Sequence, residues 1–398
     1  MHRREFFKIS FAASSALIAN LQAAQTTTQP RDNQKISPVL FPEKTKMIVH
    51  SDRPPLLEAP RSAFTTAITP NEKFFVRWHM PVIPTATNLD TYYIHVHGEV
   101  KKRLYITIDM LKNDYESIEV TVAMQCGGNS RSAFHPTTSG IQWGSGAMAC
   151  ATFKGPRLKD VLKSAGLTED ATWVNLNGND KAVMTKIENF KRELKIDEIS
   201  DDTIIAYEMN GKELPFLNGY PVRLIIPGFY ADSWVKMLSD IYVTKEYKKH
   251  FFMDVAYRIP DNDCECEEPN GLAKKTKPLE TMNVKSFIGY PSNGAKVKQK
   301  APLRIKGIAF DAGSGIKTVE ISLDGGKTWE SATLDKELSA YAFRFFTYNV
   351  KPMHKGVMTI MARATNNKGE QQPFAKDIKW NHGGYKYNGI DSVSVRVV

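Results

Sequence analysis

A single cysteine beside a glycine-rich turn is the part of this sequence best suited to chemistry. Cys126 follows an apolar, strand-like run and precedes Gly127-Gly128, and Arg131 comes five residues after it. A thiolate binds soft or redox-active metals, and a Gly-Gly turn lets a bulky cofactor approach the backbone. The planar, permanently charged guanidinium of Arg131 suits a tetrahedral oxyanion. By itself, the segment also fits a buried structural cysteine next to a surface turn.

Two further segments carry side chains that could bind an anion or a cofactor. In the first, residues 74–79, Arg77 offers donors for an oxyanion and His79 a donor for the edge of a cofactor. The same pair also fits the outer face of a half-buried strand, since exposed arginines are common. In the second segment, Arg223, Ser233 and Lys236 provide the guanidinium, hydroxyl and ammonium groups that suit a phosphate.

Two aromatic residues each allow a functional and a structural interpretation. Trp143 could form a wall of an anion pocket or could fill the core, because tryptophan buries a large surface in either case. Tyr207 could assist proton movement next to an arginine, or it could use its hydroxyl to bond backbone at the end of a strand. Arg344 belongs to an alternating run, which places its side chain on the face opposite the neighbouring aromatic residues 341, 343 and 345.

The elements that must position these residues fall into two regions of different periodicity. From about residue 44 to 252, short strands such as 93–98 mix with helical spacing such as 158–165, which predicts an α+β domain without regular strand–helix alternation. Residues 253–280 are polar and rich in Pro, Gly, Glu and Lys, which indicates a linker. Residues 281–398 alternate with a period of two between turn signals, which predicts a β-sandwich.

Taken together and in order, these segments resemble the sulfite oxidase family of molybdenum enzymes. The block 126–131 matches the family's Cys, small, Gly, Asn, x, Arg pattern, and 140–148, 204–211, 218–223 and 233–236 match further blocks. The sequence departs from the usual pattern at Trp78, where relatives usually have Asn, and at Met237, where they have Trp. The resemblance implies that Cys126 is the molybdenum ligand. It also implies catalytic roles for Tyr207, Arg77, Arg131, Arg344 and Trp143, and contacts to the pterin from His79, Arg223, Ser233 and Lys236.

The resemblance also sets out an expected fold and activity. It implies that residues 44–252 form a mixed α/β molybdopterin-binding domain with one pterin dithiolene, and that 281–398 form an immunoglobulin-like dimerisation domain. The implied reaction is the oxidation of sulfite to sulfate, with electrons passed to a separate c-type cytochrome. Three alternatives stay open: the molybdenum subunit of a sulfane dehydrogenase in a thiosulfate-oxidising complex, a periplasmic sulfoxide reductase, and a non-catalytic binding protein.

The first residues and the composition indicate where the protein works. Residues 1–24 have a charged start with Arg3-Arg4, a short apolar run and small residues at 23–24, the pattern of a twin-arginine export signal, so we expect a periplasmic protein. No other stretch is long and apolar enough to span a bilayer. The four cysteines include no Cys-x-x-Cys-His motif, so we expect no haem in this chain. The net charge of +10 is not organised into the basic and aromatic runs of a nucleic-acid binder.

Overall fold

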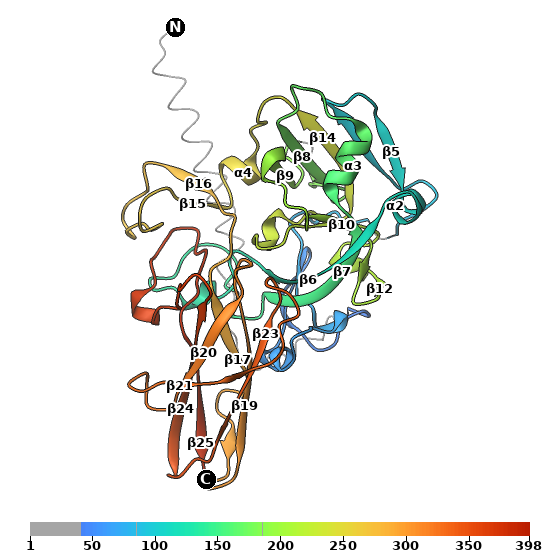
Figure 1. Ribbon diagram of the computed structural model, residues 1–398. Helices are drawn as coiled ribbons and strands as arrows, with labels where there is room; N and C mark the ends of the chain where they lie inside the picture. Colours follow the sequence, from blue (N-terminus) through green and yellow to red (C-terminus); the bar gives the residue numbers. More distant parts are fainter. Residues whose placement is uncertain (1–40, 85, 185) are drawn as a thin grey trace, which may run out of the picture. The chain divides into compact units, whose positions relative to one another are not determined.

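The computed structural model describes residues 41–84, 86–184 and 186–398 of the protein (Figure 1). The predicted export signal at residues 1–24 lies outside the described residues. Among those described, no helix is both long enough and apolar enough to cross a membrane.

The first domain is built on a mixed five-stranded sheet and a separate four-stranded sheet. The strands of the larger sheet, in order, are β5 (Leu104–Thr107), β4 (Tyr93–Gly98), β14 (Leu238–Thr244), β8 (Trp173–Gly178) and β9 (Lys191–Lys195). The strands of the smaller sheet are β12 (Lys212–Glu213), β11 (Glu208–Met209), β7 (Met148–Pro156) and β6 (Ser117–Gln125). Two small sheets complete the set, with β1 (Ile48–Asp52), β2 (Pro55–Glu58) and β3 (Val76–Arg77) in one, and β10 (Ile204–Ala206) and β13 (Arg223–Ile225) in the other.

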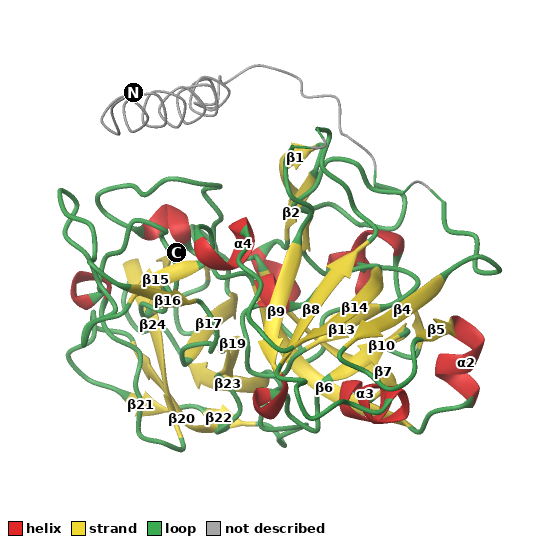
Figure 2. Ribbon diagram, turned by 90° about the horizontal axis from the view of Figure 1, so that it is seen from above, coloured by secondary structure: helices red, strands yellow, loops and turns green. Residues whose placement is uncertain are grey.

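The helices of this domain are short (Figure 2). In α2 (Ile108–Asn113), the hydroxyl of Thr107 caps the first turn by accepting a 3.2 Å hydrogen bond from the N–H of Met110. In α3 (Leu158–Ala165), all four apolar residues of the predicted helical face are buried, and Gly166 ends the helix with a φ of 68°. A third helix, α4 (Phe251–Asp254), is a single turn. The helix and the strand expected at 158–165 and 93–98 are therefore both confirmed.

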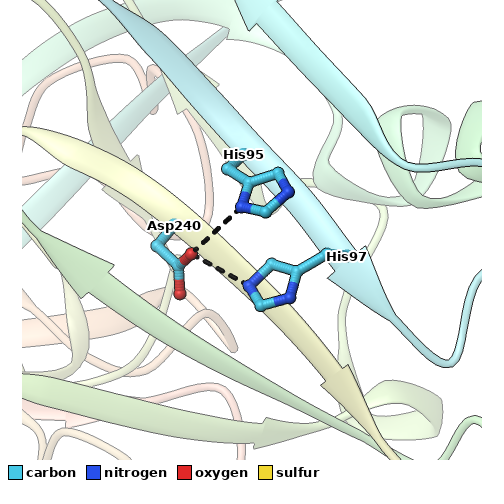
Figure 3. A group of neighbouring side chains, drawn as sticks. All are labelled: His95, His97 and Asp240. Atoms are coloured by element: carbon cyan, nitrogen blue, oxygen red, sulfur yellow. Dashed lines mark hydrogen bonds and ion pairs between the residues drawn. The ribbon is translucent and has the colours of Figure 1, made fainter.

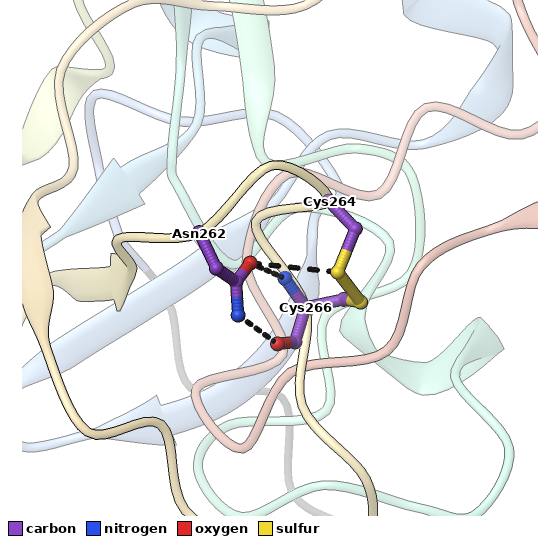
Figure 4. Close-up of a disulfide and its surroundings, with 3 residues drawn as sticks. All are labelled: Asn262, Cys264 and Cys266. Atoms are coloured by element: carbon purple, nitrogen blue, oxygen red, sulfur yellow. Dashed lines mark hydrogen bonds between the residues drawn. A yellow bond between two sulfur atoms is a disulfide. The ribbon is translucent and has the colours of Figure 1, made fainter.

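The segment expected to be a linker has regular structure of its own. Within residues 253–280, β15 (Arg258–Pro260) pairs with β16 (Thr276–Pro278). The loop between these strands contains a disulfide between Cys264 and Cys266 (Figure 4). The side chain of Asn262 bonds both the N–H and the carbonyl of Cys266, at 3.1 and 2.9 Å, which fixes the small ring of the Cys-x-Cys segment.

The second domain is a two-sheet β-sandwich, as the period of two predicts. One sheet contains β17 (Lys285–Tyr290), β19 (Leu303–Phe310), β23 (Arg344–Val350) and β22 (Thr333–Leu334). The other contains β18 (Lys296–Val297), β25 (Asp391–Val397), β24 (Gly356–Asn366), β20 (Ile316–Ser322) and β21 (Glu330–Ser331). Inward-facing residues such as Ile305, Ile321, Phe346 and Ile360 form the sandwich core. The predicted fold class, an α+β domain followed by an immunoglobulin-like sandwich, is confirmed.

The two domains share a hydrophobic core. Phe287, Phe310 and Phe343 of the second domain belong to the same buried cluster as the core of the first domain, and Phe64 packs edge-on against Phe287 at 5.2 Å. The N–H of Ala123 in β6 also donates to the carbonyl of Tyr341 at 2.7 Å. Strand β6 is therefore fixed by the second domain just before Cys126.

Candidate cofactor site at the end of strand β6

A cavity lies where β6 ends. Segments far apart in the sequence meet there: β3 and the residues after it, the end of β6, the start of β13, the residues before β14, and Tyr257. Five of the predicted site residues line the cavity, namely Arg77, His79, Cys126, Arg223 and Lys236.

Cys126 is a free, buried thiol placed by backbone hydrogen bonds on both sides. Its N–H donates to the carbonyl of Ala147 at 2.9 Å, and its carbonyl accepts from the N–H of Asn129 at 2.9 Å. Burial raises the pKa of the thiol, while the charges of Arg77 and Arg131 oppose that rise. A cation bound at the sulfur would be needed to keep this buried thiolate ionised.

The Gly127-Gly128 turn is explained by protein packing rather than by room for a cofactor. A Cβ on Gly127 would lie 2.3 Å from a methyl carbon of Leu279, and a Cβ on Gly128 would lie 2.5 Å from a guanidinium nitrogen of Arg131. Both glycines therefore make space for protein side chains. Because Gly128 has no side chain, the guanidinium of Arg131 can lie directly against the loop that carries Cys126.

Arg131 is held behind Cys126 and does not line the cavity. Its Nε donates to the carbonyl of Gly383 at 3.1 Å and its Nη1 to the carbonyl of Ile141 at 3.0 Å. Its guanidinium also lies over the ring of Tyr385, 5.2 Å from the centroid. These contacts use part of its donor capacity, so its charge acts on the cysteine from a fixed position.

Arg77 and Lys236 form a basic wall of the cavity. Lys236 Nζ donates to the carbonyl of Arg77 at 2.7 Å and lies 4.5 Å from the ring centroid of Trp78. Trp78, which differs from the family pattern, thus provides an aromatic face for the ammonium group and anchors its own indole N–H on the carbonyl of Leu217 at 3.0 Å. Burial lowers the pKa of Lys236 to about 7, so an anion in the cavity would favour its charged form.

Arg223 and Trp234 present donors that no described residue satisfies. Arg223 is buried and donates from Nη1 to the carbonyl of Asn218 at 2.9 Å, and burial lowers its pKa to about 9. Its Nε and the Nε1 of Trp234 are buried and have no hydrogen-bond partner among the described residues. Buried donors normally have a partner, so these two indicate that a ligand with acceptor atoms belongs here.

Ser233 is placed differently from the prediction. It does not line the cavity, and its hydroxyl accepts a hydrogen bond from the buried guanidinium of Arg192 at 3.2 Å. The reason is the short 3-10 turn at Ala231–Ser233, which turns its neighbours Asp232 and Trp234 toward the cavity instead. Ser233 therefore supports a buried arginine, and the phosphate contact predicted for it is not supported.

His79 and Tyr257 form a hydrogen-bonded pair inside the cavity. The ring of His79 stacks on Phe190 with centroids 3.8 Å apart, and its Nε2 lies 2.5 Å from the hydroxyl of Tyr257. Burial and the nearby charge of Arg77 lower the pKa of His79 well below its ordinary value, so the imidazole is neutral. Burial raises the pKa of Tyr257, so the phenol keeps its proton.

Sequence reasoning missed Tyr257 because the residue falls in the segment interpreted as a polar linker. The available signal was an aromatic residue following Val255 and Ala256, an apolar interruption of that segment. Tyr385 was also missed, and it lies in the long loop between β24 and β25. It is stacked on Tyr257 at 5.8 Å.

Besides Arg131, three predicted catalytic residues lie outside the cavity lining. The hydroxyl of Tyr207 lies 3.0 Å from the hydroxyl of Ser117, at the opposite end of β6 from Cys126, so Tyr257 is the phenol that the structure places near the cysteine. Trp143 is fully buried in the core and packs edge-on against His50 at 4.7 Å, which matches its structural interpretation. Arg344 starts β23 and pairs with Glu337 at 3.4 Å, so it does not join Arg77 as an anion contact.

The residues of the cavity fit a molybdopterin. The pterin and phosphate of such a group would provide the acceptors that Arg223 Nε and Trp234 Nε1 lack, and the buried basic groups of Arg77, Arg223 and Lys236 would gain an anion. Cys126 Sγ would supply the soft ligand for the metal. In its bound form the cofactor would supply a two-electron, oxygen-transferring centre.

Comparison with known proteins agrees with this geometry. Residues 79–252 match the family model of the oxidoreductase molybdopterin binding domain, and residues 276–397 match that of the Mo-co oxidoreductase dimerisation domain. The chain is 32% identical to the mitochondrial sulfite oxidase of Homo sapiens over 390 residues, covering 93% of this chain and 69% of that protein.

Two further similarities define the extent of the match. The chain is 31% identical to the mitochondrial sulfite oxidase of Mus musculus and spans 65% of its length. It therefore spans about two thirds of the length of the curated relatives that it matches. The fold is similar to that of the sulfane dehydrogenase SoxCD from Paracoccus pantotrophus, with a TM-score of 0.76 and 24% identity, covering 93% of this chain and 95% of that chain. On the sequence similarity, the two family models and the cavity around Cys126, the chain belongs to the sulfite oxidase family of molybdenum oxidoreductases.

Proposed function

We propose that the protein oxidises sulfite to sulfate at a molybdenum–molybdopterin centre held by Cys126. The observation that carries the proposal is the cavity itself, where one buried thiol meets a basic wall and a protonated phenol. In the overall reaction, sulfite and water yield sulfate, two protons and two electrons. The cofactor supplies the redox chemistry, and the protein supplies binding, orientation and electrostatics.

The chain's own residues account for three parts of this activity. Arg77 offers guanidinium donors to the oxygens of a sulfur oxyanion, because its guanidinium makes a single hydrogen bond to the described residues, to the carbonyl of Trp78 at 2.6 Å. Tyr257, paired with neutral His79, can donate to an oxygen at the cavity or pass a proton along that pair. Arg223 and Lys236 would hold the phosphate of the pterin.

The proposals for the partners and the location rest on sequence features and on the family matches. We propose export to a bacterial periplasm by the twin-arginine route, on the pattern at residues 1–24. We propose that a separate c-type cytochrome accepts the electrons one at a time, as the membership of the sulfite oxidase family suggests. A homodimer through the second domain is proposed from its match to the dimerisation family.

The test is sulfite-dependent reduction of cytochrome c by purified protein whose molybdenum content is measured. We expect turnover with about one molybdenum per chain. Full molybdenum content without sulfite turnover, together with oxidation of a protein-bound sulfane substrate, would replace this activity by that of a sulfane dehydrogenase. Absence of molybdenum from protein made in cells with an active cofactor pathway would contradict both.

A further inference from the structure

A second group of metal-ligating side chains lies on the five-stranded sheet, away from the residues of the Cys126 cavity. His95 and His97 are two residues apart on β4 and so project from the same face. Strand β14 runs parallel to β4 in a register that pairs Asp240 with His95 and Tyr242 with His97. Figure 3 shows both imidazoles turned toward the carboxylate of Asp240.

The three ligand atoms are close to the spacing that one metal ion requires. His97 Nε2 lies 3.0 Å and His95 Nδ1 3.8 Å from the same oxygen of Asp240, and all three ligand atoms lie within 4.8 Å of one another. Zinc–nitrogen and zinc–oxygen bonds of about 2.0–2.2 Å place tetrahedral ligands about 3.3–3.6 Å apart. Small side-chain rotations therefore bring the three atoms onto one ion, with no change in the strands.

Unsatisfied polar atoms at this place indicate a missing ligand. The imidazole of His95 makes no hydrogen bond with any described residue, because its Nε2 is buried without a partner and its Nδ1 is too far from Asp240. Asn177, which pairs with Asp240 from the other side in β8, has a buried Oδ1 that also lacks a partner among the described residues. Ordered water or a bound ion can satisfy such atoms, and the two imidazoles and the carboxylate gathered here favour the ion.

The imidazoles are also held in position before any ion binds. The ring of His95 stacks between Tyr105, at 4.6 Å, and His97, at 4.2 Å, and His97 stacks in turn on Tyr242 at 4.7 Å. This row of four parallel rings restricts the rotation of both ligands, which lowers the entropy lost when a metal is bound.

The group is accessible from solvent. About a quarter of each imidazole and a third of the Asp240 side chain are exposed. His95, Asp240 and Asn177 line an open cavity of about 1140 Å³. An ion can therefore enter, and coordination positions not filled by protein would face water.

We propose that His95 Nδ1, His97 Nε2 and an oxygen of Asp240 form a binding site for a divalent transition metal of the zinc or copper class. Two imidazoles and one carboxylate suit these ions, whereas magnesium and calcium prefer oxygen ligands alone. Asn177 Oδ1 or water completes the coordination. The site is separate from the molybdenum cofactor and does not depend on the reaction carried out there.

The test uses untagged protein that contains its molybdenum cofactor and has been freed of divalent ions by a chelator. We expect calorimetry and metal analysis to show one Zn²⁺ bound per chain. The double variant His95→Gln/His97→Gln is expected to weaken binding by at least about 100-fold, since it removes two of three protein ligands. His354→Gln, which changes an exposed histidine in a loop of the second domain, is the matched control and should bind Zn²⁺ as the wild type does.

Two results would overturn the site: wild-type protein that takes up no Zn²⁺, or a double variant that binds it as tightly as the wild type. Sulfite turnover and the melting temperature without added metal show whether a variant has folded. If the double variant does not fold, Asp240→Asn takes its place, and Cu²⁺ bound to the wild type is examined by electron paramagnetic resonance. Hyperfine coupling to two imidazole nitrogens would support the site, and its absence would exclude it.

Discussion

Strand β6 has a buried tyrosine at each end, and the two ends have opposite chemistry. At the Ser117 end, the hydroxyl of Tyr207 forms a neutral hydrogen bond with a serine hydroxyl. At the other end, roughly 26 Å away for an extended strand of this length, the hydroxyl of Tyr257 faces a neutral histidine in a cavity with Cys126. Both phenols are buried.

The difference shows which property distinguishes a site from a well-packed strand end. Around Tyr207 the polar groups satisfy one another. Around Tyr257, buried donors on Arg223 and Trp234 are left over, and basic groups outnumber the acids that could neutralise them. Burial of a reactive side chain is common in both places, whereas unsatisfied donors and an excess of buried charge occur at the Cys126 end.

The largest expected difference between the two ends comes from the thiol. Cys126→Ser should lower sulfite turnover by about 1000-fold or more, because a serine hydroxyl does not replace a soft thiolate ligand. The near-identical size of the side chain should leave the fold intact. Steady-state cytochrome c reduction and a circular dichroism melt measure the two effects. Near-normal turnover would show that the cysteine is structural.

The two tyrosines provide a matched pair for the next effect. Tyr257→Phe should lower kcat by about 10- to 100-fold, since the variant loses the proton donor next to His79. Tyr207→Phe should change kcat by less than about twofold and cost roughly 1 kcal/mol of stability through the lost bond to Ser117. Equal effects of the two substitutions on kcat would show that the two ends of β6 do not differ in catalysis.

A pair of arginines tests the anion contact. Arg77→Met should lower kcat/KM for sulfite about 10- to 100-fold, as expected when a charged hydrogen-bond donor to an oxyanion is lost. Arg344→Met, which removes a partly exposed partner of Glu337, should leave kcat/KM close to that of the wild type. If only Arg344→Met affects sulfite kinetics, the anion contact belongs to Arg344 and not to Arg77.

A buried lysine should make stability depend on pH at the Cys126 end. Lys285 donates to the hydroxyl of Ser130 at 2.8 Å, and burial lowers its pKa to about 8. Between pH 8 and the ordinary lysine pKa of about 10.4, the unfolded chain keeps a proton that the folded protein has lost, so this group makes stability rise with pH. Lys285→Met should therefore flatten the rise by roughly 1–3 kcal/mol in urea titrations at pH 7.5 and 10.5. An unchanged slope would show that Lys285 does not titrate in this range.

The sequence was most informative where a local pattern determines the structure. The helical spacing at 158–165 and the alternation of the second domain correspond to the observed helix and sandwich, because these patterns reflect burial of one face. Cys126, Arg77, His79, Arg223 and Lys236 meet in one cavity, as their shared motifs predicted.

The predictions failed where long-range placement decides. Tyr207 lies in a well-matched segment, but its N–H donates to the carbonyl of Lys154 in β7, which places its side chain near Ser117, at the end of β6 away from Cys126. Tyr257 follows no motif and reaches the cavity because the chain between α4 and β15 passes beside His79. Such positions depend on contacts between segments nearly 180 residues apart, which no local pattern encodes.

The hydrogen bond from Arg131 to Gly383 has a consequence for how the protein is made. The two residues are 252 positions apart, and the N–H of Lys386 also bonds the carbonyl of Gly127. During synthesis the cysteine loop leaves the ribosome long before the segment that fixes it. In a nascent first domain, the loop that carries Cys126 therefore lacks these two hydrogen bonds. They form only after the end of the second domain has been made.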